Sequence, residues 1–252
     1  IYSVWELYPE IAQKLNELNS KLLLSLFKKI DNYCLKIIDE VVVNSDELKL
    51  YLTRERDVKE NKVSVIYHFS NATASKKPEE ISNHIIYTGN LGKPQNIQSF
   101  IDKLNKSTIP FKLTIYGSGS EYEDILNYRS KFIEVNPYTI RTQIIDDTKD
   151  VPFALVSLSS ELTVEGFPGK TFDYLKMNKI LIGYSNPNSG LAKFIEEYNV
   201  GINIDPNNHN LDEDLKKLNN KESLQKFYKN IENVNNNIAN IKAVAQSYSN
   251  LI

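Results

Sequence analysis

The sequence has 252 residues, of which 41% are hydrophobic and 25% are charged, and its formal net charge is −2 at pH 7. This composition is typical of a soluble globular protein with one large domain or two small ones. The near-neutral charge argues against sequence-independent binding to nucleic acid, which relies on an excess of lysine and arginine. The longest apolar runs, at 22–24 and 41–43, are much shorter than a bilayer requires, so we expect no membrane-spanning helix.

Cysteine and histidine usage narrows the kinds of site that the chain can hold. Cys34 is the only cysteine, which excludes an intrachain disulfide framework and fits a reducing compartment. His68, His84 and His209 are scattered without the spacing of metal ligands, so we expect no metal site. The chain starts at Ile1 without an initiator Met, and we therefore expect it to be a fragment of a longer protein.

Apolar residues recur at helical spacing from 11 to 38, which predicts one or two amphipathic helices. We expect their apolar stripe to pack in a core rather than to lie on a membrane, although docking on a membrane that carries a lipid-linked acceptor is the alternative. The valine run at 41–43 predicts a short buried strand. Ser45 is a suitable N-cap for a helix that reaches Leu52, and 63–67 predicts another strand.

The second part of the chain alternates strands with helices. Before it, the stretch 70–78 lacks any apolar period, which predicts a linker. The expected strands cover 85–87, 111–116, 132–135, 153–158, 180–184 and 200–204. The expected helices cover 97–104, 122–128, 139–145, 170–176, 191–198 and most of 211–252. Such alternation indicates an α/β fold with a parallel, doubly wound sheet of the Rossmann type.

This pattern divides the chain into three parts. Residues 1–70 form the end of one α/β domain, 71–84 a linker, and 85–252 a Rossmann-like domain with C-terminal helices. In an open parallel sheet, ligands bind where the carboxyl ends of the strands meet. The loops that follow the strands of the third part are therefore the first place to look for a site.

The loop after the strand at 85–87 contains Gly89, Asn90, Gly92 and Lys93. Glycines let backbone N–H groups approach a phosphate closely, the next helix N-terminus favours an anion, and Lys93 adds a positive charge. A glycine turn that only reverses the chain is the alternative interpretation of this loop.

The glycine loop at 117–119 has a structural role in our interpretation. It does not complete a G-x-G-x-x-G motif, because Tyr122 stands at the third glycine position. No acidic residue ends the next strand at the distance that a dinucleotide-binding fold requires. This loop therefore argues against an NAD enzyme.

The loop at 165–174 is the most informative of the three. Glu165 precedes a predicted helix, Lys170 begins that helix, and Asp173 follows eight residues after Glu165. This spacing would hold the anions and hydroxyls of one ligand between two carboxylates and a lysine. Two surface acids that flank a turn are the alternative.

Five segments of the chain match the motifs of one enzyme family in the right order. Residues 86–95 are similar to its YxGNxGxxQ loop, 112–119 to its hxhhGxG strand and turn, and 165–174 to its E-x7-E element. Residues 178–182 and 199–202 stand where GKPVI and xxGxxv are usual. The chain resembles the donor-binding half of a GT-B retaining glycosyltransferase of the family 4 (group 1) type, preceded by the end of its N-terminal, acceptor-side domain.

This resemblance implies transfer of a sugar, with retention of configuration, from a UDP- or GDP-sugar to a glycan or lipid-linked acceptor. The pathway would be that of a capsule or another surface polysaccharide or glycoconjugate. The resemblance implies no metal, no cofactor and no nucleic-acid partner. The expected location is the cytoplasm, with peripheral association at the inner face of the membrane.

The resemblance also assigns roles to individual residues. Glu165 would contact the hydroxyls of the donor sugar, and Asp173 would hold the ribose. Lys170, which we group with Glu165 as catalytic, and Lys93 would stabilise the leaving nucleoside diphosphate. The remaining residues would bind the nucleotide; they are Gly89, Asn90, Gly92, Phe167, Gly169 and Thr171 near the diphosphate and Pro137 and Tyr138 near the base.

Two other functions stay open at this point. A non-catalytic module that binds a nucleotide or a glycan would keep the same fold and the same loops. A GT-B-type epimerase or phosphorylase is less favoured, because the chain has few carboxylates and histidines in positions suited to acid–base chemistry.

Overall fold

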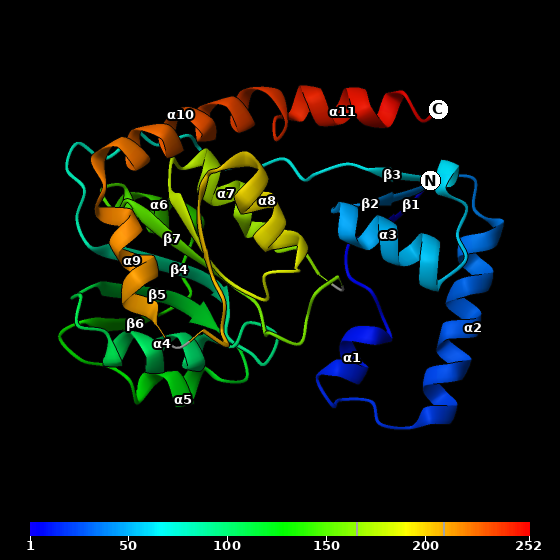
Figure 1. Cartoon of the computed structure of the whole chain (residues 1–252), viewed down its shortest axis with the longest axis horizontal. Helices are drawn as coiled ribbons and strands as arrows, with labels where there is room; N and C mark the ends of the chain where they lie inside the picture. Colours follow the sequence, from blue (N-terminus) through cyan, green and yellow to red (C-terminus); the bar gives the residue numbers. More distant parts are fainter. Residues whose placement is uncertain (165, 209) are drawn as a thin grey trace.

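The computed structural model describes residues 1–164, 166–208 and 210–252, and it contains two parallel sheets with helices packed around them (Figure 1). The first sheet has the order β1-β2-β3, with strands Tyr2–Val4, Val41–Val43 and Val63–Val65. The second has the order β6-β5-β4-β7-β8-β9. Its strands are β4 His84–Asn90, β5 Lys112–Ser118, β6 Ile133–Pro137, β7 Phe153–Ser157, β8 Ile180–Tyr184 and β9 Gly201–Ile204.

Helices connect the strands in nearly strict alternation, which confirms the α/β fold class. They are α1 Glu10–Lys14, α2 Lys21–Ile37, α3 Asp46–Glu55, α4 Ile97–Lys106, α5 Tyr122–Leu126, α6 Arg141–Thr148, α7 Lys170–Lys176, α8 Gly190–Tyr198, α9 Leu211–Lys216, α10 Lys221–Asn237 and α11 Ile241–Ser249. Two short 3₁₀ turns lie at Glu60–Lys62 and Lys217–Asn219. The predicted helix at 170–176 has these same bounds in the structure, whereas strand β1 was not expected from the sequence.

The central strands of the second sheet are apolar along their whole length. Every residue of β7 and β8 is buried. A parallel sheet is covered by helices on both faces, so its inner strands carry continuous apolar runs instead of alternating ones. This explains why the runs at 153–158 and 180–184 were recognisable as strands in the sequence.

The strand order reverses between β4 and β7. From β4 the chain first builds outwards through β5 and β6, and then continues on the other side through β7, β8 and β9. Ligands of doubly wound sheets bind in the crevice at the carboxyl ends of strands where the order reverses. Here that crevice lies between the loop after β4 and the loop after β7.

The C-terminal helices join the two sheets. Helix α10 packs against α7 and α8 of the second sheet's layer, and α11 continues past it to the first sheet (Figure 1). There Val244 packs with Val42 and Ile66, and the hydroxyls of Tyr248 and Ser3 lie 3.3 Å apart. The domain boundaries inferred above stay a prediction, but the chain clearly returns to its N-terminal sheet at the end.

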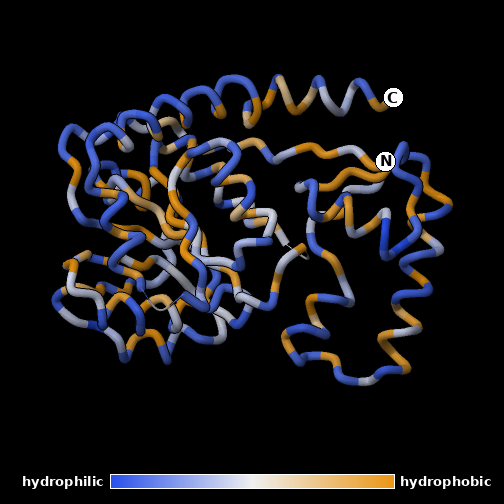
Figure 2. Tube along the Cα trace, in the orientation of Figure 1, coloured by the Kyte–Doolittle hydropathy of each residue, from blue (hydrophilic) through white to orange (hydrophobic). Residues whose placement is uncertain are grey.

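Helix α2 contradicts the expectation that its apolar stripe packs in a core. Only Leu24 and Leu35 are buried, whereas Leu22, Ile30 and Ile37 are among its exposed apolar residues. Figure 2 shows the hydrophobic stretches of α2 along the edge of the molecule, on the side away from the six-stranded sheet. The apolar face of α2 therefore points outwards.

A buried ion cluster explains why α2 turns its polar side inwards. Arg56, which follows α3 and is 3% exposed, donates through Nε to Glu10 at 3.0 Å and through an Nη to Asp31 of α2 at 3.0 Å. A second Nη bonds Asn32 and the Lys28 carbonyl oxygen. Because buried charges need partners, α2 presents these polar groups to Arg56 and leaves its apolar side to the exterior.

Candidate active site

Lys170 and the carboxyl end of β4 meet at the point where the strand order reverses. Lys170 is the first residue of α7, and its Nζ donates to the Tyr87 hydroxyl at 2.9 Å. The same nitrogen lies 4.0 Å from the centroid of the Tyr87 ring. The structure thus brings together two loops that the sequence connected only through the predicted strand order.

Gly89 provides the space for this approach. Its φ of +121° lies in a region that side chains rarely adopt, and a Cβ built on it would stand 3.0 Å from Lys170 Nζ. The backbone conformation therefore requires Gly89, and a side chain here would also displace the end of Lys170. The ammonium group thus lies against the carboxyl end of β4, between the Tyr87 hydroxyl and the Gly89 backbone.

Burial sets the protonation of Lys170. The surrounding protein removes water from the ammonium and lowers the pKa of Lys170 to about 7. Tyr87 stays a neutral phenol, because burial raises its pKa well above its usual value, and its hydroxyl donates to the Asn90 carbonyl oxygen. A phosphate that entered beside Lys170 would favour the charged lysine, so the site is suited to binding an anion.

The rest of the glycine loop is held in place by neighbouring loops. The Asn90 side chain donates to Gln95 at 3.1 Å, and Gly92 is buried, while Lys93 is exposed. A Cβ at Gly117 would lie 2.7 Å from the Leu91 side chain, so this glycine at the end of β5 allows the two segments to pack. This contact agrees with the structural role inferred for 117–119.

Asp173 forms contacts with two segments that the sequence did not connect to it. The Ser70 hydroxyl donates to Asp173 at 2.6 Å, and Arg141, the first residue of α6, forms an ion pair with the same carboxylate oxygen. Arg141 was missed in the sequence, where the loop after β6 was noted only for its Pro137 and Tyr138. One feature of the sequence could have drawn attention to Arg141: it is one of only four arginines in the chain.

A cavity of about 610 Å³ lies next to Asp173, between the first sheet and the start of α7. His68 and Trp5 form part of its lining, with ring centroids 3.9 Å apart in an edge-to-face arrangement. Burial lowers the pKa of His68, and the negative charge of Asp173 partly opposes this shift. His68 is therefore a second cleft residue that sequence reasoning did not assign to the site.

The other predicted nucleotide-binding residues differ in their surroundings. Pro137 ends β6, and Tyr138 is 54% exposed, with its N–H donating to the Gly117 carbonyl oxygen at 3.0 Å. Both therefore lie at the same edge of the sheet as the glycine loops. Gly169, the N-cap of α7, has open space where a Cβ would stand.

Phe167 and Thr171 point away from solvent. Phe167 stacks on Phe172, with ring centroids 5.7 Å apart, inside an aromatic cluster that includes Tyr67 and Phe194. Thr171 is fully buried, and its hydroxyl has no hydrogen-bond partner among the described residues. The Thr171 backbone N–H is also occupied, since it donates to the Pro168 carbonyl oxygen at 3.0 Å, whereas Phe167 contributes to the lining of the cavity next to Asp173.

Glu165, the residue predicted to contact the donor sugar, lies outside the described residues. In the part of the chain that the structure describes, no group of three or more His, Cys, Asp or Glu side chains is placed to hold a metal ion. None of the described helices combines the length and the apolar character needed to cross a membrane.

Comparisons with known proteins give matches at the level of structure only. No protein-family model and no curated protein matches this sequence. HepE from Anabaena, solved in complex with UDP, superposes with a TM-score of 0.72 at 11% identity, over 99% of this chain and 70% of HepE. TarM from S. aureus, solved with fondaparinux, alpha-GlcNAc-glycerol and UDP, gives 0.68 at 18% identity, over 88% of this chain and 46% of TarM.

A third structure belongs to a protein of lipopolysaccharide synthesis. The outer core galactosyltransferase WaaB gives a TM-score of 0.66 at 16% identity, over 86% of this chain and 62% of WaaB. The chain thus spans about half to two thirds of the length of TarM and WaaB. Its parallel sheets, their strand order and these superpositions together give it the Rossmann-like GT-B fold that these glycosyltransferases share.

Proposed function

We propose that this chain carries the donor-binding half of a retaining glycosyltransferase of the family 4 type. It would transfer a sugar from a UDP- or GDP-sugar to a glycan or lipid-linked acceptor during synthesis of a surface polysaccharide, a capsule or another glycoconjugate. The observation that carries the proposal is the position of Lys170 Nζ beside Gly89, at the point where the strand order reverses.

The chemistry of such a transfer fits the groups in the crevice. When the bond to the sugar breaks, negative charge develops on the β-phosphate of the leaving nucleotide. A positioned cation in a site shielded from water stabilises that charge more strongly than a cation in bulk water. Lys170 and Arg141 would supply this stabilisation without a metal ion, with Lys93 at the rim of the site.

The structural neighbours support a nucleotide-sugar donor. HepE has been solved with UDP, with UDP-glucose, and with UDP and glucose, and the TarM complex contains UDP. These ligands belong to those proteins. For this chain they favour UDP over GDP as the first nucleotide to test.

A thermal-shift panel tests the proposal directly. UDP, UDP-glucose, GDP, a GDP-sugar, ADP and CMP would be added to the wild-type chain and to Lys170→Met. We expect a UDP or GDP compound to raise Tm in the wild type and to have a much smaller effect on Lys170→Met. Lys242→Gln, which changes an exposed lysine of α11, is the matched control and should respond like the wild type. Stabilisation by none of these nucleotides would contradict the proposal.

A non-catalytic binding module is the second candidate. It is favoured by one observation: Asp173, which would hold the ribose, is already bonded to Ser70 and Arg141. Binding of a nucleotide sugar without any sugar transfer or donor hydrolysis would support this alternative. Release of UDP from a UDP-sugar, measured in a coupled assay, would exclude it.

We also propose a cytoplasmic location at the inner face of the membrane. The support is helix α2, whose outward face combines exposed leucines and isoleucines with Lys21, Lys29 and Lys36. Such a helix can lie in the interface of an anionic bilayer. Co-sedimentation with vesicles that contain anionic lipid should occur with the wild type and be lost in Leu26→Glu/Ile30→Glu. Equal sedimentation of both proteins would mean that this face has another role.

A further inference from the structure

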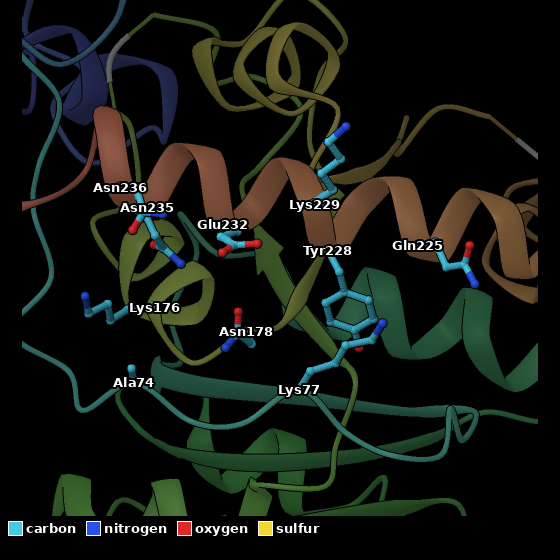
Figure 3. Close-up of a pocket in the computed structure, with 10 residues that line it drawn as sticks. All are labelled: Ala74, Lys77, Lys176, Asn178, Gln225, Tyr228, Lys229, Glu232, Asn235 and Asn236. Carbon is cyan, nitrogen blue, oxygen red and sulfur yellow. The ribbon is translucent and has the colours of Figure 1, made fainter.

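A second, polar pocket lies at the opposite end of α7 from Lys170 (Figure 3). Since α7 has seven residues, the two ends are separated by about 10 Å along the helix axis. The pocket has a volume of about 520 Å³ and lies between the segment 74–77, the end of α7 and helix α10. Its lining consists of Ala74, Lys77, Lys176, Asn178, Gln225, Tyr228, Lys229, Glu232, Asn235 and Asn236.

Tyr228 is the feature that points to a ligand. Its side chain is only 7% exposed, and its hydroxyl has no hydrogen-bond partner among the described residues. Buried hydroxyl groups normally form hydrogen bonds, so the unpaired Tyr228 hydroxyl is suited to bond a ligand. Figure 3 shows the Tyr228 side chain pointing from α10 towards Lys77.

The neighbourhood of that hydroxyl favours an acceptor with negative charge. Lys77 Nζ lies over the face of the Tyr228 ring, 4.3 Å from its centroid, so the ammonium is close to the phenol. Burial raises the pKa of Tyr228 to about 12, and the phenol therefore keeps its proton and can donate it in a hydrogen bond. A phosphate or carboxylate oxygen satisfies both groups at once.

Two amide side chains supply the complementary acceptors. Asn178 donates its N–H to the Ser75 carbonyl oxygen at 2.6 Å, and Asn235 donates to the Leu175 carbonyl oxygen at 2.7 Å. These bonds fix the orientation of both amides. The side-chain carbonyl oxygens have no donor among the described residues, so they can accept hydrogen bonds from the hydroxyls of a ligand.

The charged side chains of the lining also favour a ligand with negative charge. The lining contains three lysines and one glutamate, Glu232, and none of these four side chains forms an ion pair with another described residue. The volume falls within the range of about 300–1,000 Å³ that is usual for small-molecule sites, and a single phosphate ion would leave most of it empty. The ligand therefore combines a negative group with a body that carries several hydroxyls.

We propose that this pocket is a second ligand site, separate from the donor crevice, which binds an anionic saccharide: a sugar unit that carries a phosphate or a carboxylate group. The anion would lie against Lys77 and the Tyr228 hydroxyl, and the sugar hydroxyls would bond the amides of Asn178 and Asn235. This site does not depend on the nature of the donor.

Heteronuclear NMR titrations of the ¹⁵N-labelled chain test this assignment. The probes are glucose 6-phosphate, glucuronate, inorganic phosphate and glucose. We expect at least one of the two anionic sugars to cause saturable shifts of the amides around Lys77, Asn178 and Tyr228. Glucose should cause none, and inorganic phosphate should bind about tenfold more weakly because it leaves the amides unused. Equal affinity for phosphate alone, or no saturable shift with either anionic sugar, would overturn the proposal.

Variants separate this pocket from the rest of the surface. Tyr228→Phe removes only the hydroxyl and Lys77→Gln removes the ammonium, and each should weaken binding of the anionic sugar about tenfold. Lys226→Gln, an exposed lysine of α10 outside the lining, should bind like the wild type. UDP binding to all three variants should be unchanged, so a failure here is distinct from a failure of the donor site. Unchanged anion binding in Tyr228→Phe and Lys77→Gln would refute the assignment.

Discussion

Arg141 and Asp173 form an ion pair between the first turn of α6 and the first turn of α7. The Ser70 hydroxyl bonds the same carboxylate at 2.6 Å, so Asp173 joins three segments at the edge of the cavity next to the first sheet. Both charged side chains are well exposed, at 45% and 37%. An exposed pair of this kind contributes only about 0–1 kcal/mol to stability, so replacing either residue should leave the fold largely intact.

The first prediction concerns Arg141. If its guanidinium moves from Asp173 to the diphosphate of the donor, Arg141→Gln should weaken UDP binding about 10- to 100-fold, the loss expected for hydrogen bonds to a charged group. Isothermal titration measures the affinity, and Tm should change little because the pair is exposed. Arg54→Gln, an exposed arginine of α3, is the control. Wild-type affinity in Arg141→Gln would exclude a contact with the diphosphate.

The second prediction distinguishes a contact with the ribose from a contact with the diphosphate. Asp173 would hold the ribose, so Asp173→Asn should weaken binding of UDP but leave binding of inorganic diphosphate unchanged or slightly stronger. The slight gain would come from Arg141, which loses its charged partner. Arg141→Gln should weaken both ligands. Equal losses for UDP and diphosphate in Asp173→Asn would show that its carboxylate does not act through the ribose.

The third prediction concerns pH. The pKa of Lys170 is lowered to about 7 in the free protein, so below pH 7 the lysine is already charged and binds a phosphate without taking up a proton. Above pH 7 it must gain a proton on binding, and UDP affinity should fall by up to about tenfold per pH unit. Lys170→Arg stays charged at these pH values and should lose this dependence. A flat profile for the wild type between pH 6 and about pH 9 would contradict the role of burial at Lys170.

A fourth prediction tests the space between Gly89 and Lys170. Gly89→Ala places a methyl group about 3.0 Å from Lys170 Nζ on a backbone with φ of +121°. Both effects displace the lysine, so UDP affinity should fall, and Tm should decrease as well because the backbone is strained. Gly166→Ala is the matched control, since its Cβ would enter open space and its φ lies outside the region that side chains rarely adopt. UDP affinity that decreases equally in both variants would show that the Lys170 contact is irrelevant.

The sequence predicted the second sheet well because its strands are buried on both faces. Continuous apolar runs such as 153–158 and 180–184 leave few alternatives to a central parallel strand, and short loops fix the order of the elements. The helix at 170–176 was recognisable from the Gly-Phe-Pro-Gly turn before it and its position after a strand. Local patterns therefore defined most of the Rossmann-like part.

Helix α2 could not be predicted by the same reasoning. Its apolar spacing is that of a helix packed on a core, yet Arg56 and Glu10 form a buried ion cluster that draws Asp31 and Asn32 inwards. These four residues lie up to 46 positions apart in the sequence. A periodicity shows that a helix has two faces, but only long-range partners decide which of them is buried.

The site residues also show that local sequence patterns do not reveal which distant residues meet. Gly89 and Lys170 were chosen from separate loops, and the strand order that brings them together follows from general rules for parallel sheets. Arg141 and His68 were missed because nothing local distinguishes them. Their roles arise from Asp173, which lies 32 residues after Arg141 and 105 after His68. Glu165, chosen from the same motif as Asp173, stays a prediction.

A last prediction concerns Lys179, a fully buried lysine at the start of β8. Its Nζ donates to the carbonyl oxygens of Thr148, Lys149 and Val151, which end α6 and lead into β7. In Lys179→Met the Thr148 carbonyl oxygen still accepts from the Val151 N–H at 3.0 Å, but the Lys149 and Val151 carbonyl oxygens lose the ammonium, and each orphaned group costs about 1–3 kcal/mol. Because the methionine itself avoids the desolvation of a charge, we expect a net loss of about 2–3 kcal/mol and a Tm lower by about 5–10 °C. Lys216→Met, at an exposed position of α9, should leave Tm unchanged within error. Equal Tm values for the two variants would mean that water replaces the ammonium at no cost, and that Lys179 does not hold the end of α6 against the sheet.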